Sequence, residues 1–86
     1  MKTREVSTND SLRADDHTIL VRNTDHPVAI SVDPATLPIL QNYFVENLSI
    51  GPVFVYPGRH IIRPGYRVRV FTADGLSLKV AGSRLN

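Results

Sequence analysis

The side chains that offer the most chemistry in this sequence are basic and lie in its second half. Arg67, Arg69 and Phe71 alternate with apolar residues in the segment 66–72, so a strand would present all three on one face. A basic stripe beside an exposed aromatic ring suits an anionic partner, either a phosphate backbone or an acidic protein surface. We therefore predict a partner-binding surface made of Arg59, Arg63, Arg67, Arg69, Phe71 and Lys79.

The central part of this surface is expected to lie on a β-hairpin. The segments 66–72 and 76–80 are predicted to pair around a turn that contains Gly75. In the expected register, Arg69 lies opposite Lys79 on the outer face, where like charges destabilise the pair by a fraction of a kcal/mol. The alternative to a binding surface is a solvated face, on which the long basic side chains cover the sheet.

Two kinds of anionic partner are open for this surface. Eight of the ten basic residues are arginine, which is enriched at protein interfaces, whereas lysine is depleted there. Proteins that bind single-stranded nucleic acid stack bases on several aromatic rings, and Phe71 is the only outward ring of the predicted hairpin. We therefore predict a protein partner, which is a larger assembly or another copy of the chain, with nucleic acid as the alternative.

Metal binding is not predicted, although three histidines are present. The chain has no cysteine, and His17, His26 and His60 are widely separated. Metal sites favour histidines at short, regular spacing, often together with cysteine or carboxylate ligands. Asp16 and Asp25 directly precede two of the histidines, but neighbours in an extended chain point to opposite faces.

Residues for catalysis form no recognisable arrangement either. Ser31, Ser49 and Ser77 lie in strand-like or loop contexts, and none belongs to a Gly-x-Ser-x-Gly nucleophile elbow. The five glycines are scattered singly, so the chain has no glycine-rich loop to hold phosphate groups. We expect neither an enzymatic activity nor a cofactor.

Size and composition limit the scaffold that positions these side chains. The chain has 86 residues, which suits one small domain, and without cysteine that domain has no disulfide. No apolar run approaches the length of a membrane span, and the N-terminal residues lack the apolar stretch of a secretory signal. We expect a cytoplasmic protein without a membrane partner, or a protein that becomes part of a virion.

Charge and hydrophobicity are divided unevenly along the chain. Residues 1–46 contain four basic and seven acidic side chains, whereas residues 47–86 contain six basic and one acidic. Such asymmetry indicates a partner surface, or two halves that neutralise each other in the fold. Residues 1–17 are mostly polar, so we predict a flexible N-terminal arm that is either a free tail or ordered by a partner.

Several short segments with strand character follow the predicted arm, each bounded by proline, glycine or other turn residues. Prolines at 34 and 38 interrupt the series. Residues 38–46 fit either a short helix that begins at Pro38 or a strand, because neither pattern is clean. The predicted strands are residues 18–23, 28–33, 53–56, 59–63, 66–72 and 76–80.

Short strands at this spacing predict an all-β fold, which is a sandwich or a small barrel. The segments 21–28 and 63–70 resemble the strand-and-turn pattern of immunoglobulin-like interaction domains, and the resemblance implies their architecture. We predict a small immunoglobulin-like β-sandwich or small barrel of about six or seven short antiparallel strands. This domain is expected to span residues 18–82, with residues 83–86 as a C-terminal tail.

These observations favour a non-enzymatic structural or interaction protein that docks on a larger assembly. A virion component, such as a capsid decoration or head-to-tail joining protein, is the most concrete instance by analogy. The alternative is a nucleic-acid-binding β module that uses the arginine-rich hairpin. A third candidate is a small inhibitor that presents residues 33–38 to an enzyme.

Overall fold

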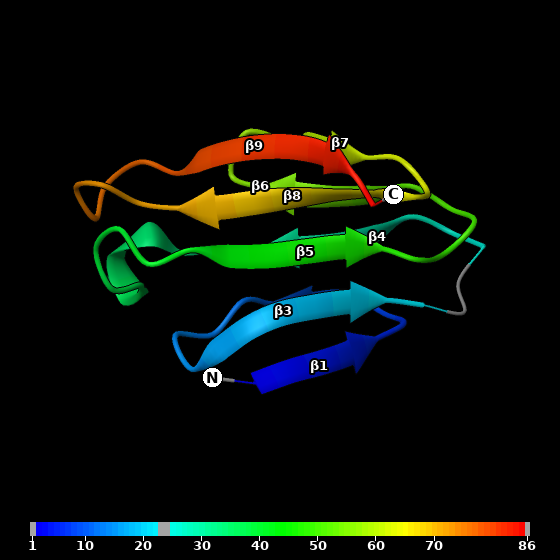
Figure 1. Cartoon of the computed structure of the whole chain (residues 1–86), viewed down its shortest axis with the longest axis horizontal. Helices are drawn as coiled ribbons and strands as arrows, with labels where there is room; N and C mark the ends of the chain where they lie inside the picture. The colour runs from blue at the N-terminus through cyan, green and yellow to red at the C-terminus, as the bar shows by residue number, and fades with distance from the viewer. Residues whose placement is uncertain (1, 23–24, 86) are drawn as a thin grey trace.

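The computed structural model describes residues 2–22 and 25–85 of the chain. Within these residues the regular structure is almost entirely β-strand, and the one helix is a single 3-10 turn (Figure 1). The elements are β1 (Lys2–Val6), β2 (Asp10–Ser11), β3 (Asp16–Val21), β4 (Val28–Ser31), η1 (Pro34–Thr36), β5 (Tyr43–Asn47), β6 (Val53–Tyr56), β7 (His60–Ile62), β8 (Tyr66–Phe71) and β9 (Lys79–Arg84).

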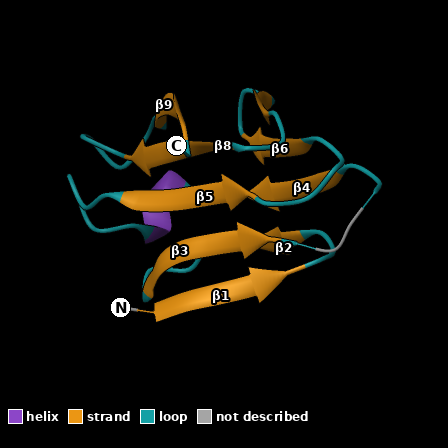
Figure 2. Ribbon diagram, turned by 45° about the vertical axis from the view of Figure 1, so that its right-hand side comes forward, coloured by secondary structure: helices purple, strands orange, loops and turns teal. Residues whose placement is uncertain are grey.

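The strands form two mixed sheets that lie in two layers (Figure 2). Sheet A has the order β1-β3-β5-β8-β9, and sheet B has the order β2-β4-β6-β7. The chain crosses to sheet B after β1, β3 and β5, so successive strands in each sheet run parallel up to β6. After β6 the chain reverses direction. In the antiparallel pairs, β7 pairs with β6, β8 pairs with β5, and β9 pairs with β8.

The all-β prediction is confirmed, but the described part of the chain has nine strands rather than six or seven, and the predictions of antiparallel pairing throughout and of a small barrel as the alternative are wrong. Four strand pairs are parallel, and in the described residues neither sheet closes into a barrel. Parallel strands need a long crossover connection, which is usually a helix. Here a strand of the opposite sheet makes the crossover, and alternation within single strands does not reveal that arrangement.

The inner faces of both sheets contribute to one aliphatic core. Alternate residues of most central strands are buried, as in β5, where Tyr43, Val45 and Asn47 point inward. The buried hydrophobic side chains are Leu12, Ile19, Val21, Val28, Ile30, Val32, Leu37, Tyr43, Val45, Val53, Val55, Ile62, Val68 and Val70.

The predicted N-terminal arm differs from the structure, because its residues belong to both sheets. Lys2–Val6 pair in parallel with β3, and Asp10–Ser11 pair in parallel with β4. Leu12 is buried in the core, and Val6 packs against it. This segment is held in the fold with few apolar residues, because the inward-pointing Arg4 makes polar contacts with the neighbouring strands. Met1 lies outside the described residues.

Residues 38–46 contain no helix, and the strand alternative is correct for residues 43–46, whereas residues 38–42 form a turn and irregular structure. Tyr43 and Val45 are fully buried while Phe44 and Glu46 are partly exposed, which is the alternation of a strand. A helix is prevented before β5, because Leu40 has a left-handed φ of 62°. The one helical turn lies earlier, at Pro34–Thr36, and the side chain of Asp33 caps it.

The last strand begins later than predicted. Residues 76–78 do not belong to a strand, since β9 spans Lys79–Arg84, and it includes two residues of the predicted tail. The hydroxyl of Thr72 accepts from the Gly75 N–H and donates to the Ser77 carbonyl. The Asp74 carboxylate accepts from the N–H groups of Leu76 and Ser77, so side chains satisfy the backbone that a ladder would have used. Asn86 lies outside the described residues.

None of the helical structure in residues 2–22 and 25–85 has the length and hydrophobicity to cross a bilayer.

Candidate partner-binding surface

Three of the predicted binding residues lie together on β8. Val68 and Val70 point into the core, so Arg67, Arg69 and Phe71 point outward from sheet A. Lys79 pairs with Phe71 across the β8–β9 ladder and lies on the same outer face. We call this outward group, together with Phe44 of the neighbouring β5, the arginine face.

The register of the β8–β9 hairpin differs from the predicted one. Lys79 lies opposite Phe71, and Arg69 lies opposite Ala81, so the expected pairing of Arg69 with Lys79 is wrong. The polar loop that precedes β9 shifts the ladder and removes this like-charge contact. Arg67 lies opposite Ser83, so both arginines have a small residue beside them at the edge of the sheet.

Aromatic rings support both guanidinium groups of the arginine face. The Cζ atom of Arg67 lies 4.9 Å from the centroid of the Phe44 ring. The Cζ atom of Arg69 lies 5.3 Å from the centroid of the Phe71 ring. Both distances are within cation–π range, which limits the motion of the long side chains. Phe44 was not predicted as a site residue, because the sequence left its segment open between helix and strand.

A shallow hollow lies between these arginines and the edge strand. Its volume is about 390 Å³, and we call it the outer hollow. Glu46 lies 3.8 Å from Arg67, measured from Oε2 to Nη1, and neutralises part of the local charge. The two guanidinium groups still exceed this single carboxylate, so the hollow suits an anionic group from a partner. It is lined by Asn42, Phe44, Arg67, Arg69, Ala81, Gly82 and Ser83.

The structure places the two remaining predicted residues elsewhere. Arg59 lies in the turn between β6 and β7, and its Cζ atom is 5.3 Å from the Phe54 ring centroid. Phe54 is on the outer side of sheet B, so Arg59 does not belong to the arginine face. Arg63 follows β7 and lines a second hollow together with Tyr66 and Arg67.

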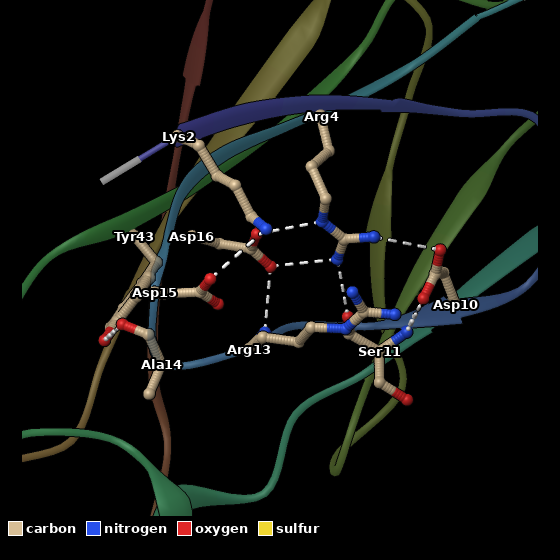
Figure 3. A network of polar contacts seen from close by, with 9 residues as sticks. All are labelled: Lys2, Arg4, Asp10, Ser11, Arg13, Ala14, Asp15, Asp16 and Tyr43. Atoms are coloured by element: carbon tan, nitrogen blue, oxygen red, sulfur yellow. Dashed lines mark hydrogen bonds and ion pairs between the residues drawn. The ribbon is translucent and has the colours of Figure 1, made fainter.

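One charged cluster that was not predicted lies under the N-terminal edge of sheet A (Figure 3). The Arg4 guanidinium donates two hydrogen bonds to Asp16, a longer one to Asp10 and one to the Ser11 carbonyl. The Asp16 carboxylate also accepts from the Arg13 backbone N–H at 2.9 Å. The cluster joins β1, β2 and β3, so its position indicates a structural role.

The protonation states of this cluster fit that role. Burial by itself raises the pKa of Asp16, but hydrogen bonds from Arg4 and the Arg13 N–H outweigh it and hold the pKa below its usual range. The hydrogen bond to Asp16 raises the pKa of Arg4. Both groups therefore remain charged at neutral pH. One signal for this cluster is present in the sequence. Arg4 and Val6 are two positions apart, so they share one face of β1, and this face is directed toward the core.

Among the residues that the structure describes, no three histidine, cysteine, aspartate or glutamate side chains are grouped so that they could hold a metal ion. Compared with known proteins, the chain matches no family model, no curated protein and no solved structure. The geometry of its own residues therefore carries the functional proposal.

Proposed function

We propose that this protein is a non-enzymatic interaction module that docks on a larger protein assembly through the arginine face. The supporting observation is that Arg67 and Arg69 line one hollow on an exposed sheet surface. Arginine and aromatic residues are enriched at protein interfaces, and this face combines both. Because the rings of Phe44 and Phe71 hold the guanidinium groups, less side-chain entropy is lost when a partner binds.

The sign of the charge favours an acidic partner surface. Arg67, Arg69 and Lys79 point to the same side of sheet A, where Glu46 is the carboxylate that lies near Arg67. Complementary charge speeds the encounter of two proteins and excludes partners of the same sign.

The scaffold that we propose for this surface is a β-sandwich. The shared core of the two sheets supports that description. Immunoglobulin domains use antiparallel sheets, so the parallel pairs of this protein give it a different strand topology. Among larger assemblies, a virion is the concrete instance that we propose, because capsid decoration and joining proteins need compact β modules.

Charge reversal on the arginine face, compared with the same reversal on the outer side of sheet B, tests the docking proposal. The tagged protein is purified from its native source under gentle conditions, and mass spectrometry identifies what accompanies it. We expect Arg69→Glu to reduce recovery of the partner about tenfold or more, since the reversed charge repels an acidic surface. The matched control is Arg59→Glu, which makes the same charge change on the outer side of sheet B. Equal recovery with wild type and Arg69→Glu would refute docking through this face.

Nucleic acid is the second candidate partner, because stacked rings accompany the arginines. Phe44 and Phe71 both lie on the arginine face, which doubles the aromatic surface expected from the sequence. Titration with a single-stranded oligonucleotide at increasing salt tests this candidate. Phosphate contacts would cause affinity to fall steeply with salt, and an absence of binding at low salt would exclude it.

A further inference from the structure

The four edges of the two sheets are not equally protected. Edge strands in natural proteins are blocked against further pairing by short length, by bulges or by inward-pointing charges. In sheet B, β2 has two residues and β7 has three. In sheet A, β1 has a register shift after Lys2 and carries the inward-pointing Arg4. These three edges therefore offer little to an added strand.

The fourth edge, β9, lacks these three protections, and its charged residues, Lys79 and Arg84, lie at its two ends. It has six residues, contains no proline and pairs with β8 without a register shift. Nearly all of its residues are exposed, and among the described residues no further strand pairs with its free side. A long, regular edge of this kind is a template for another strand.

The hydrogen-bonding groups that face away from β8 can be identified. The Leu85 N–H donates to the Gly65 carbonyl at 3.0 Å, which fixes the alternation of the antiparallel ladder. Residues an even number of positions from Leu85 therefore bond to β8. The backbone groups of Val80, Gly82 and Arg84 face solvent instead.

Two hollows flank this edge, one on each side of Gly82. The outer hollow lies on the arginine face, where Ala81 and Ser83 are too small to separate the edge from Arg69 and Arg67. The inner hollow, with a volume of about 240 Å³, opens between the two sheets. Its lining includes the apolar residues Ile61, Ile62, Tyr66 and Val68, together with Arg63, Arg67 and Gly82.

We propose that β9 binds an extended segment of a partner protein, which adds one strand to sheet A. Side chains of an added strand alternate between the faces of the sheet, so alternate residues enter the two hollows. Acidic side chains on the outer face reach Arg67 and Arg69, and apolar side chains on the inner face contact Tyr66 and Val68. The ligand is therefore an extended peptide in which acidic and apolar residues alternate.

Charge argues against a second copy of the chain as the occupant. An antiparallel pairing of two β9 strands that uses these outward groups places Gly82 of one copy opposite Gly82 of the other, and it continues the outer face of sheet A from one copy into the next. The basic side chains of both arginine faces would then share one surface, where like charges repel. An acidic segment instead places opposite charges beside the same residues.

The inference deepens the proposed function, because it rests on a protein partner at the arginine face. The probes are short capped peptides in which glutamate alternates with valine, leucine or phenylalanine. Peptides of the same composition with all glutamates grouped at one end are the matched controls. Isothermal titration should show the alternating peptides binding about tenfold or more tightly than the grouped ones.

Amide hydrogen exchange on the wild-type protein gives a second readout. With an alternating peptide bound, the N–H groups of Val80, Gly82 and Arg84 should become protected, because they gain partners in the new ladder. Binding by charge alone would not produce that alternate pattern. Equal binding of grouped peptides, no binding by any alternating peptide, or a bound state without this protection would overturn the proposal. A peptide-free dimer that protects the same three amides would assign the edge to a second copy and would also overturn it.

A substitution at Gly82 separates this inference from docking in general. Gly82→Pro removes an N–H that faces solvent, so the β8–β9 ladder is kept while the added strand loses a bond. Gly82→Ala is the control, because a Cβ atom there would lie 3.8 Å from its nearest neighbours. If Arg69→Glu abolishes recovery of the native partner and Gly82→Pro does not, docking stands and strand addition fails. If alternating peptides give the expected protection while Arg69→Glu leaves recovery unchanged, strand addition stands and docking through the arginine face fails.

Discussion

Arg4 and Asp16 are joined by two parallel hydrogen bonds, with an Nε–Oδ1 distance of 2.8 Å and an Nη2–Oδ2 distance of 2.9 Å. The Asp16 side chain is fully buried, and the Arg4 side chain is 17% exposed. A buried ion pair of this geometry contributes little relative to a hydrophobic pair, but removal of one partner is costly because the other charge remains buried. The pair therefore makes β1 dependent on β3.

Arg4→Met should lower the free energy of unfolding by about 3 kcal/mol, because it leaves the Asp16 carboxylate without its main partner. Adding Asp16→Asn should restore part of this loss, since the neutral amide still accepts from the Arg13 N–H. Urea unfolding followed by circular dichroism measures both changes. Lys2→Met is the control, because the Lys2–Asp15 pair is exposed, and it should leave the midpoint unchanged. A double variant as unstable as Arg4→Met would contradict the stranded-charge explanation.

The same carboxylate predicts how stability depends on acid. The pKa of Asp16 is lower in the folded protein than its ordinary value of 3.8, so the folded state binds fewer protons there than the unfolded state. The resulting stability is fully present above pH 3.8 and is lost as the pH falls through the folded-state pKa. Unfolding free energies measured through this range should fall less steeply for Asp16→Asn than for wild type. Asp15 and Asp74 also have lowered pKa values, so the variant should retain some slope.

The buried Asn47 should be as important for stability as the ion pair. Its amide N–H groups donate to the carbonyls of Gly51 and Ile62, and its carbonyl accepts from Ser49. Asn47→Ala should lower the unfolding free energy by about 3 kcal/mol, because several buried backbone groups lose their partner. Asn47→Asp should be no more stable than Asn47→Ala, since carboxylate oxygens cannot donate hydrogen bonds to those two carbonyls. Thermal unfolding of both variants tests the prediction, and a stable Asn47→Asp would show that the donors are unimportant.

The loop before β9 provides a local test of the hairpin register. Thr72→Val keeps the shape of the buried side chain but removes the hydroxyl that contacts Gly75 and Ser77. We expect a loss of about 1–2 kcal/mol and faster hydrogen exchange at the Gly75 amide. Thr72→Ser retains the hydroxyl and should exchange as wild type does. Unchanged exchange in Thr72→Val would mean that the hydroxyl does not hold the loop.

Strand positions were more predictable than strand partners. The segment Val53–Tyr56 was predicted with its observed bounds, because glycine and proline mark both of its ends. The parallel pairing of β4 with β6 was not predictable, since alternation identifies a buried face and not the neighbouring strand. Arg4 was predicted to belong to a polar arm, because its carboxylate partners become its neighbours only after the chain has folded.

The candidate site was predictable to a similar degree. Alternation with Val68 and Val70 correctly placed Arg67, Arg69 and Phe71 on one outer face. The position of Lys79 opposite Arg69 was wrong, because side-chain hydrogen bonds in the loop set the ladder. Arg59 is near these residues in sequence but lies on sheet B, and a linear pattern cannot distinguish the two sheets.

The winding of the chain between the two sheets has a consequence for synthesis on the ribosome. The two hairpins that join consecutive strands, β6–β7 and β8–β9, both belong to the second half of the chain. The first half contains strands whose parallel partners lie beyond a crossover through the other sheet. Hairpins close quickly, whereas non-local parallel pairs must first lose the entropy of loop closure. The part of the protein that is made first should therefore be completed last, when the C-terminal hairpins have emerged.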